Sequence, residues 1–336
     1  MIKKNRTFII AEAGVNHNGS YNLAKKLIDA AKYCDADAIK FQTFNATKSI
    51  SKFAKKIKYQ KKNEIDKISQ LNMLKKLELS NLEFVKLKKY CKKKKILFLS
   101  TPKSIDDARF LNKIGMRVFK IGSGDILDFE LLNYIAKTKK KVILSTGMST
   151  LKEIKKAVKC FNKKKITLLH CVSLYPTPIN LANLKTIPFL KKKLGIECGF
   201  SDHTLGFEAS LGAVSLGAHV IEKHLTINKK LSGPDHKTSL TVSDFKNMVL
   251  SIRNIDKALG ESKKVVSRKE KQNIKLFRRG LVFNKDLKKN SKVQEDDIST
   301  KRPLTGLEPI FKKKLIGKTL KKDVFEDQPI LKSFFK

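Results

Sequence analysis

The sequence predicts a (β/α)8 TIM barrel followed by a small β-rich domain, and two observations lead to this fold class. Short apolar runs alternate with amphipathic segments over about 260 residues, which is typical of βα units in a parallel sheet and of the length of a TIM barrel. Beyond Gly260 the pattern changes to short apolar runs interrupted by Pro and Gly. A doubly wound open sheet shares the alternation, but no Gly-x-Gly-x-x-Gly follows the first apolar run, so we favour the barrel.

Eight apolar runs are the expected strands, and each is followed by a segment with helical spacing. In chain order the strands are 8–13, 38–41, 96–100, 118–121, 142–145, 166–171, 196–200 and 220–222. The clearest of the eight expected helices are 21–33, 81–93, 105–114, 151–161 and 207–216. A last helix over 243–259 should have Ser243 as its N-cap and end at Gly260.

Two connections are too long to be simple loops, namely 43–78 after the second strand and 225–242 after the eighth. Both should leave the barrel at the C-terminal ends of the strands, where extra loop length usually serves a site. We expect residues 1–260 to form the barrel, a polar and lysine-rich linker to follow over 261–276, and the small domain to occupy 277–336.

The chain is strongly basic, with 73 Lys and Arg against 31 Asp and Glu, but only eight of the basic residues are Arg. Specific recognition of bases and phosphates depends on Arg, and the lysines lie in short runs near the predicted helix ends. We therefore interpret them as solvated charge that attracts anionic substrates, with no nucleic-acid partner. The sequence contains no secretory h-region or membrane span, and its five Cys lack metal-ligand spacing. We expect a cytoplasmic protein with reduced thiols and no membrane partner.

Polar residues follow all eight predicted strands, at the end where a TIM barrel has its active site. One such residue is easily a cap or a structural hydrogen bond, whereas eight strands that all end this way are difficult to explain by packing. The sequence therefore predicts an enzyme. In strand order the residues are Glu12, Asn16 and His17; Lys40 and Gln42; Thr101; Lys120 and Ser123; Ser145 and Thr146; His170, Ser173 and Tyr175; Ser201, Asp202 and His203; Glu222 and His224.

Lys40 and Lys120 lie on or beside apolar strands, in the segments KFQ and KIGSGD. A buried lysine is costly unless it meets a counter-charge. We expect both to face a phosphate or carboxylate, with Thr101, Ser123 and Ser145 as further donors. A lysine that extends to solvent and a lysine that forms a Schiff base with a carbonyl substrate are the alternatives.

Two histidines are the candidate metal ligands. His203 in SDHT and His224 in EKH follow neighbouring strands, so their rings can converge on one divalent ion. Neutral imidazoles suit zinc, manganese, iron or cobalt. His236, in the connection 225–242, is either a third ligand or a group that supports the ligands. We expect His170 to be structural or supporting and His219 to lie at the start of the eighth strand, away from the site.

Nine ordered motifs, over about residues 7–330, resemble the sialic acid synthase family, which includes N-acetylneuraminate, N,N′-diacetyllegionaminate and pseudaminate synthases. The resemblance implies a TIM barrel with a C-terminal SAF domain similar to type III antifreeze proteins. It also implies condensation of phosphoenolpyruvate with the open-chain aldehyde of an N-acetylmannosamine-type sugar, with release of phosphate. The motifs are AEAGVNHNG, IKFQTF, FKIGSGD, ILSTGMST, LLHCVSLYPTP, GFSDHTLG, IEKHLT, GPDHKTSL and KRPLTG.

The resemblance also implies roles for individual residues. Glu12 would be the acid/base group, with Glu222 orienting it or the reacting water, and His203 and His224 would bind a divalent metal, typically Mn²⁺, with Mg²⁺ or Co²⁺ as alternatives. Arg302 would reach the sugar of the partner subunit, because family members are domain-swapped homodimers. The implied phosphoenolpyruvate-binding residues are Lys40, Thr101, Lys120, Ser123, Ser145 and Ser201. The implied sugar-binding residues are Gln42, Asp125, Ser173, Tyr175, Asp235 and Arg302.

Two departures from the family pattern leave the sugar open. Asp125 stands where many relatives have Glu, and Ser173 where some N-acetylneuraminate synthases have Asn. N-acetylmannosamine, which gives N-acetylneuraminate, is the first expectation, and 2,4-diacetamido-2,4,6-trideoxymannose, which gives N,N′-diacetyllegionaminate, is the alternative.

Two other functions are less favoured. A synthase of 3-deoxy-heptulosonate or octulosonate phosphates would not need the small domain with its KRP motif. A non-catalytic carbohydrate or polyanion binder would not need polar groups at all eight strand ends.

Overall fold

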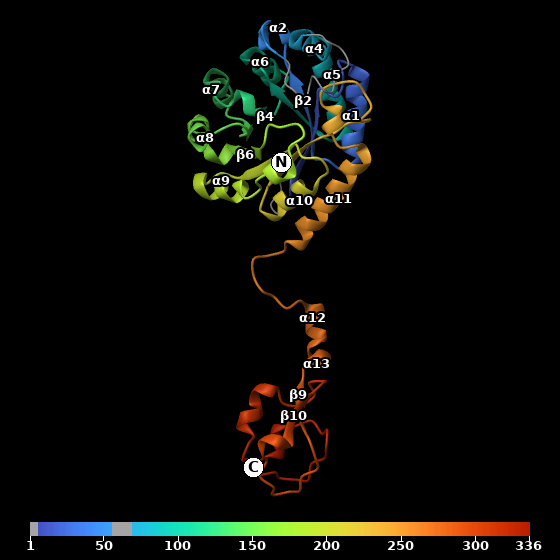
Figure 1. Ribbon diagram of the computed structural model, residues 1–336, viewed down its shortest axis with the longest axis vertical. Coiled ribbons are helices and arrows are strands. Elements are labelled where there is room, and N and C mark those ends of the chain that lie inside the picture. Colours follow the sequence, from blue (N-terminus) through green and yellow to red (C-terminus); the bar gives the residue numbers. More distant parts are fainter. Residues whose placement is uncertain (1–5, 56–68) are drawn as a thin grey trace. The chain divides into compact units, whose positions relative to one another are not determined.

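The computed structural model describes residues 6–55 and 69–336, and the chain divides into two compact units, Met1–Gly260 and Glu261–Lys336 (Figure 1). Each unit has a hydrophobic core of its own. The boundaries that the sequence predicts for separate domains stay a proposal. None of the helices in the described ranges combines the length and apolar composition that crossing a bilayer requires.

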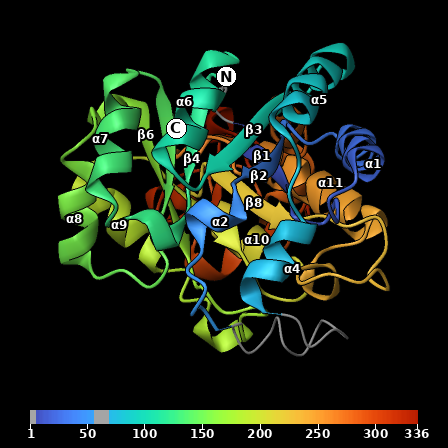
Figure 2. The ribbon, with the colours of Figure 1, turned by 90° about the horizontal axis from the view of Figure 1, so that it is seen from above.

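The first unit is an eight-stranded parallel barrel, which confirms the predicted fold class. The strands pair in the order β3-β2-β1-β8-β7-β6-β5-β4, and β3 and β4 lie next to each other, so the sheet is nearly closed (Figure 2). The strands are β1 (Phe8–Gly14), β2 (Ala38–Thr43), β3 (Leu97–Pro102), β4 (Val118–Ile121), β5 (Lys141–Ser145), β6 (Ile166–Cys171), β7 (Cys198–Asp202) and β8 (Val220–His224).

Helices cover the outside of the barrel (Figure 2). The connection after β2 contains the short helices α2 (Ala46–Ser49) and α4 (Gln70–Lys76), and part of this predicted long connection lies outside the described residues. The longer helices are α1 (Tyr21–Tyr33), α5 (Asn81–Lys94), α6 (Ile105–Lys113), α7 (Phe129–Lys137), α8 (Leu151–Val158), α9 (Thr186–Leu194), α10 (Glu208–Ser215) and α11 (Val242–Ala258).

The start of α11 corrects one prediction. Its N-cap is Thr241, whose hydroxyl accepts a hydrogen bond from the amide of Asp244 at 3.2 Å, and Ser243 lies inside the first turn. Both residues can cap, and the sequence pattern does not show which hydroxyl meets the free amide. The predicted stop is confirmed, because Gly260 follows the C-cap Leu259 with a φ of +54°.

The barrel interior changes character along its axis. At the N-terminal ends of the strands it is apolar, filled by residues such as Phe8, Ile10, Leu99 and Ile143. Side chains alternate between the two faces of a strand, so the inward-facing residue that follows Ile10 on β1 is Glu12. The same step of two residues brings polar groups inward at the C-terminal ends of the other strands, and this positions the site.

The second unit is built from short elements. Strands β9 (Gly280–Phe283) and β10 (Ile298–Lys301) pair in antiparallel fashion over a small apolar core. The helices α12 (Arg268–Gln272) and α13 (Ile274–Phe277) occupy part of the stretch predicted to be a linker. No residue of either helix is buried, so the apolar spacing that reveals a packed helix is missing there.

Candidate active site

A cavity of about 330 Å³ lies at the C-terminal ends of the barrel strands. Of the sixteen site residues that the sequence predicts, all but Asp125 and Arg302 line it, although the role of each stays a prediction. The residues brought together are Glu12, Lys40, Gln42, Thr101, Lys120, Ser123, Ser145, Ser173, Tyr175, Ser201, His203, Glu222, His224 and Asp235.

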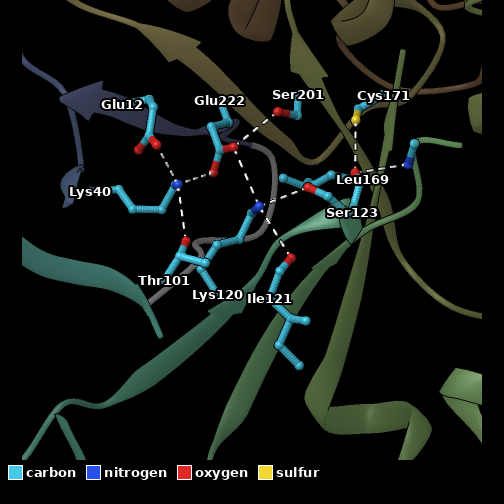
Figure 3. Close-up of polar contacts among 12 residues, drawn as sticks. Glu12, Lys40, Thr101, Lys120, Ile121, Ser123, Leu169, Cys171, Ser201 and Glu222 are labelled. Carbon is cyan, nitrogen blue, oxygen red and sulfur yellow. Dashed lines mark hydrogen bonds and ion pairs between the residues drawn. The ribbon is translucent and has the colours of Figure 1, made fainter. Parts of the chain in front are cut away.

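Two lysines and two glutamates form a buried network in this cavity (Figure 3). Lys40 Nζ lies 2.7 Å from Glu12 Oε1 and 3.8 Å from Glu222 Oε2, and Lys120 Nζ lies 3.4 Å from Glu222 Oε1. All four side chains are at most 7% exposed. The lysines therefore do not extend to solvent, and the opposite charges offset the cost of burying each other.

Hydroxyl groups complete the network (Figure 3). Lys40 donates to Thr101 Oγ1 at 3.2 Å, Lys120 donates to Ser145 Oγ at 2.7 Å, and Ser201 donates to Glu222 Oε1 at 2.9 Å. Six different strands, β2, β3, β4, β5, β7 and β8, supply these side chains, so closure of the barrel brings them together.

The two carboxyl groups have different pKa values. Burial raises the pKa of Glu12 to about 7, even though Lys40 opposes the shift. Burial also acts to raise the pKa of Glu222, but Lys120 and Lys40, together with the Ser201 hydrogen bond, lower it to about 2. Two neighbouring carboxyls with separated pKa values are the usual arrangement of an acid/base site. One oxygen of each, Oε2, has no hydrogen-bond partner within the described residues and can meet a substrate.

The rings of His203 and His224 lie with their centroids 5.8 Å apart, at the ends of neighbouring strands. His203 Nδ1 is 2.7 Å from the carbonyl of Val172, which leaves Nε2 for another partner, and His224 Nδ1 is buried with no hydrogen-bond partner among residues 6–55 and 69–336. Burial lowers the pKa of both rings, so both are neutral near pH 7. Neutral imidazoles with a free nitrogen are metal-ligand donors.

These two histidines fit a catalytic divalent metal better than a structural one. Within the described ranges no three His, Cys, Asp or Glu side chains are arranged to hold an ion together. A structural site closes its coordination shell with protein ligands, whereas a catalytic site keeps positions open for substrate and water. Tyr175 packs beside the pair, with its ring centroid 4.1 Å from that of His203.

His236 is not available as a third ligand. Its Nδ1 contacts Thr226 Oγ1 at 2.7 Å and its Nε2 contacts Asn18 Oδ1 at 3.1 Å, so both ring nitrogens hold the connection between β8 and α11 in place. His170 is structural, as expected, because its Nε2 bonds to the carbonyl of Ala182 at 2.8 Å. Some polar residues at strand ends therefore shape the loops and do not face the cavity.

Asp125 and Arg302 stay predictions as sugar contacts. The Asp125 carboxylate is paired with Lys103 at 2.9 Å, and it is Lys103 that lines the cavity. Arg302 directly follows β10 in the second unit and is exposed. Sequence reasoning missed Lys103, although its position two residues beyond Thr101, directly after the end of β3, is a usable signal.

Two further cavity residues gave little or no signal in the sequence. Met148 is 75% exposed and has a φ of +59°, a conformation that its residue type does not suggest. Cys171 faces the cavity two residues after the inward-facing Leu169, and its Sγ lies 3.2 Å from Ser123 Oγ.

A nearly closed parallel barrel with buried acid/base groups at the C-terminal ends of its strands defines a TIM-barrel enzyme. The family follows from comparison with known proteins, in which residues 27–264 match the NeuB family and residues 278–336 match the SAF domain. The chain belongs to the NeuB family, and the predicted family resemblance is confirmed.

Three similar proteins illustrate the relationship. The chain is 47% identical over 330 residues to an N,N′-diacetyllegionaminic acid synthase of Campylobacter jejuni, covering 97% of this chain and 99% of that protein. It is 39% identical over 320 residues to the protein of the same name in Legionella pneumophila, covering 93% and 90%. The crystal structure of an N-acetylneuraminic acid synthetase from Leptospira borgpetersenii matches with a TM-score of 0.73 and 39% identity, covering 81% of this chain and 92% of that one.

Proposed function

We propose that this protein condenses phosphoenolpyruvate with the open-chain aldehyde of an N-acetylated amino sugar, giving a nonulosonic acid and phosphate. The observation that carries the proposal is the buried network of Lys40, Lys120, Glu12 and Glu222 beside the two neutral imidazoles. It provides cations for an anionic substrate and a carboxyl group that exchanges a proton near neutral pH in one cavity.

The two lysines are suited to the carboxylate and phosphate of phosphoenolpyruvate. Their Nζ atoms now contact Glu12 and Glu222, and a bound anion would take over part of those contacts. Burial strengthens each charge interaction, since little water competes with it. The hydroxyls proposed to bind phosphoenolpyruvate beside them belong to Thr101, Ser123, Ser145 and Ser201.

His203 and His224 would hold a divalent cation, for which we propose Mn²⁺, with Mg²⁺ and Co²⁺ as alternatives. When bound, the cation supplies Lewis acidity that polarises the sugar aldehyde. Glu12, with a pKa of about 7, is suited to hold or release the proton that moves during the reaction, and Glu222 stays ionised and orients it. Gln42 donates to Glu12 Oε1 at 3.5 Å, which places its amide beside this group.

The proposed chemistry balances with water as the third reactant, whose two protons end on the former aldehyde oxygen and on the released phosphate. The methylene carbon of phosphoenolpyruvate bonds to the aldehyde carbon of the sugar, and the aldehyde oxygen takes a proton to become a hydroxyl. Water then adds to the second carbon of the former enolpyruvate, phosphate leaves, and that carbon becomes a ketone. The residues proposed to contact the sugar are Gln42, Asp125, Ser173, Tyr175, Asp235 and Arg302.

For the sugar, we propose 2,4-diacetamido-2,4,6-trideoxymannose ahead of N-acetylmannosamine, which reverses the order expected from the sequence. Two relatives that the chain matches over 90% or more of both lengths are named N,N′-diacetyllegionaminic acid synthases. The match to an N-acetylneuraminic acid synthetase structure keeps N-acetylmannosamine as the second candidate. A cytoplasmic location fits the five free cysteines.

One experiment tests the reaction. Phosphate release is measured with phosphoenolpyruvate and each of the two sugars, with arabinose 5-phosphate and erythrose 4-phosphate as controls, with and without EDTA. We expect release only with N-acetylated sugars, faster with the diacetamido sugar, and abolished by EDTA. Release only with the sugar phosphates would replace the proposal by the heptulosonate or octulosonate class. No release with any sugar would leave a binding protein.

Arg302 is proposed to contact the N-acetyl group of the sugar bound by a partner subunit in a domain-swapped homodimer. Arg302→Ala should then raise the sugar KM about 10- to 100-fold and leave the phosphoenolpyruvate KM unchanged, because a hydrogen bond from a charged group contributes about 1.5–3 kcal/mol. Lys301→Ala is the matched control. An unchanged sugar KM would reject the contact.

A mixing experiment tests the exchange of the second unit between subunits. An Arg302→Ala chain mixed with a His203→Ala chain should regain activity, because one site then receives an intact barrel and an intact arginine. Failure to regain activity, after subunit exchange has been demonstrated by mass spectrometry, would reject the swap.

A further inference from the structure

Strands β7 and β8 carry two sets of side chains on opposite faces of the barrel wall. On the inner face Ser201 donates to Glu222, and on the outer face, one residue further along each strand, Asp202 and Lys223 form an ion pair at 2.9 Å. Asp202 and Lys223 are also partners in the strand register. Their side chains are at most 1% exposed, so the barrel wall contains a fully buried charge pair directly before His203 and His224.

The ion pair is bonded to the backbone on the far side of His203. Asp202 Oδ1 accepts from the amide of Thr204 at 2.8 Å and from its hydroxyl at 2.7 Å. Lys223 Nζ donates to the carbonyl of Thr204 at 2.6 Å. The residues before and after His203 are therefore fixed by the same pair, and Ser210 of α10 fixes the other carboxylate oxygen at 2.7 Å.

His224 depends on the pair in a different way. The ring of His203 has an anchor of its own, the carbonyl of Val172, whereas His224 Nδ1 has no hydrogen-bond partner in the described part of the chain. The position of the His224 ring therefore depends on the backbone of His224. The preceding residue, Lys223, is held by its bond to Thr204, and the carbonyl of His224 accepts a hydrogen bond from the amide of Leu240.

A buried ion pair is a poor way to stabilise a fold, because apolar residues of similar volume are often as stable or more so. The advantage of a buried ion pair is geometric, because each buried charge must stay within reach of its hydrogen-bond partners. We infer that Asp202 and Lys223 are positioning residues that hold the imidazoles of His203 and His224 in the relative placement needed for one divalent cation. This inference rests on the metal role proposed above for the two histidines.

The test removes both charges and keeps the side-chain shapes. Asp202→Asn/Lys223→Met is compared with Asp37→Asn/Arg253→Met, which neutralises an ion pair of 2.8 Å at the opposite end of the barrel. Mn²⁺ affinity is measured on the full-length, substrate-free proteins by the electron paramagnetic resonance signal of free Mn²⁺. We expect the dissociation constant to rise at least about tenfold in the first variant, as residues supporting metal ligands usually cause, and less than twofold in the second.

A second readout does not need the metal. Histidine-labelled protein without Mn²⁺ is followed by ¹⁵N NMR of the ring nitrogens, assigned with single His→Gln variants. We expect the His203 and His224 signals to shift or broaden in Asp202→Asn/Lys223→Met, while the structural His170 keeps its signal. If wild-type protein binds no Mn²⁺, the proposed metal role fails, and these signals alone decide whether the pair positions the rings.

Ser210→Ala serves if the double variant does not fold. It removes one of the donors to Asp202 and touches neither histidine, so we expect a smaller rise of the Mn²⁺ dissociation constant, about two- to fivefold. Wild-type Mn²⁺ affinity together with unchanged ring signals, in the double variant or in Ser210→Ala, would overturn the inference and leave the pair a purely structural one.

Discussion

The two ends of the barrel use buried charge in different ways. At the C-terminal end, Lys40 and Glu12 lie inside the barrel, at most 4% exposed, and bond mainly to other side chains. At the N-terminal end, Arg253 pairs with Asp37 and Asp256, whose side chains are 10–16% exposed. These carboxylates also accept from backbone amides, from Ile9 in the case of Asp37 and from Thr7 in the case of Asp256.

This difference indicates that the two charge networks have different functions. Carboxylates bonded to backbone amides join β1 and β2 to α11, so the N-terminal network ties elements of the fold together. The carboxylates at the C-terminal end each keep one oxygen without a hydrogen-bond partner among the described residues, and their pKa values are driven apart. The first network is arranged for stability and the second for a substrate, as expected for the two ends of a TIM barrel.

The largest effect on activity should come from replacing a histidine at the C-terminal end of the barrel. His203→Ala removes one proposed ligand of the cation, and we expect kcat/KM to fall at least about 10⁴-fold, because Lewis-acid stabilisation contributes several kcal/mol. Steady-state phosphate release at saturating Mn²⁺ measures this. His170→Gln is the control, since His170 does not line the cavity and its Nε2 bonds to the backbone carbonyl of Ala182. Full turnover by His203→Ala would contradict the catalytic role assigned to the C-terminal end of the barrel.

Glu12→Gln should lower kcat/KM about 10²- to 10³-fold, the usual contribution of an acid/base group. In wild-type protein a limb of the pH–rate profile should lie near pH 7, where Glu12 titrates. The limb should disappear in Glu12→Gln. Glu153→Gln, which changes a capping residue of α8 that does not line the cavity, should keep both the rate and the limb.

The same group affects stability with a definite sign. The pKa of Glu12 is raised from 4.5 to about 7, so between these pH values the folded protein holds a proton that the unfolded chain releases. Its contribution therefore falls as the pH rises through this window, by up to about 3 kcal/mol. Urea unfolding of Glu12→Gln between pH 4.5 and 8 should show a flatter dependence than wild type. An identical slope would show that Glu12 does not hold this proton.

Replacing a residue of the N-terminal network should lower stability and leave activity almost unchanged. Arg253→Met leaves Asp37 and Asp256 without their shared guanidinium, and we expect the free energy of unfolding to fall by about 1–3 kcal/mol. We expect kcat and both KM values to change less than twofold. Urea denaturation and steady-state kinetics on one preparation check both halves. A large loss of kcat with unchanged stability would contradict the division of roles.

The position of polar residues at the ends of the predicted strands made the site predictable. Glu12, Lys40 and Glu222 were singled out because they end apolar runs where a TIM barrel has its active site. The alternation of side chains along a strand, which was not applied, would have separated Asp202 from Ser201 and His203, because Asp202 points to the opposite face. The structural role of a strand-end residue such as His170 can be recognised only once the path of the loop that it bonds to is known.

Other features depend on contacts between distant parts of the chain. Which lysine meets which glutamate follows from the stagger of the closed barrel, and the packing of Tyr175 on His203 follows from the path of the loop after β6. The positive φ of Met148 is also set by its surroundings, because most residue types avoid that conformation.

The smallest effect is expected from the lysines at the helix ends, which lie at the same end of the barrel as Arg253. Lys92 and Lys93 lie in the last turn of α5, are exposed, and are favoured there by the helix dipole. Replacing both by Gln should lower the free energy of unfolding by about 1 kcal/mol or less and change kcat/KM less than twofold at 0.15 M salt, where charges more than about 8 Å apart are screened. Wild-type protein should also not bind duplex DNA tightly near ~0.2 M salt, because contacts with phosphates alone weaken strongly there. Fluorescence anisotropy with a labelled duplex measures that binding, and tight binding that the Lys92→Gln/Lys93→Gln variant loses would show that exposed charge at this end has a partner.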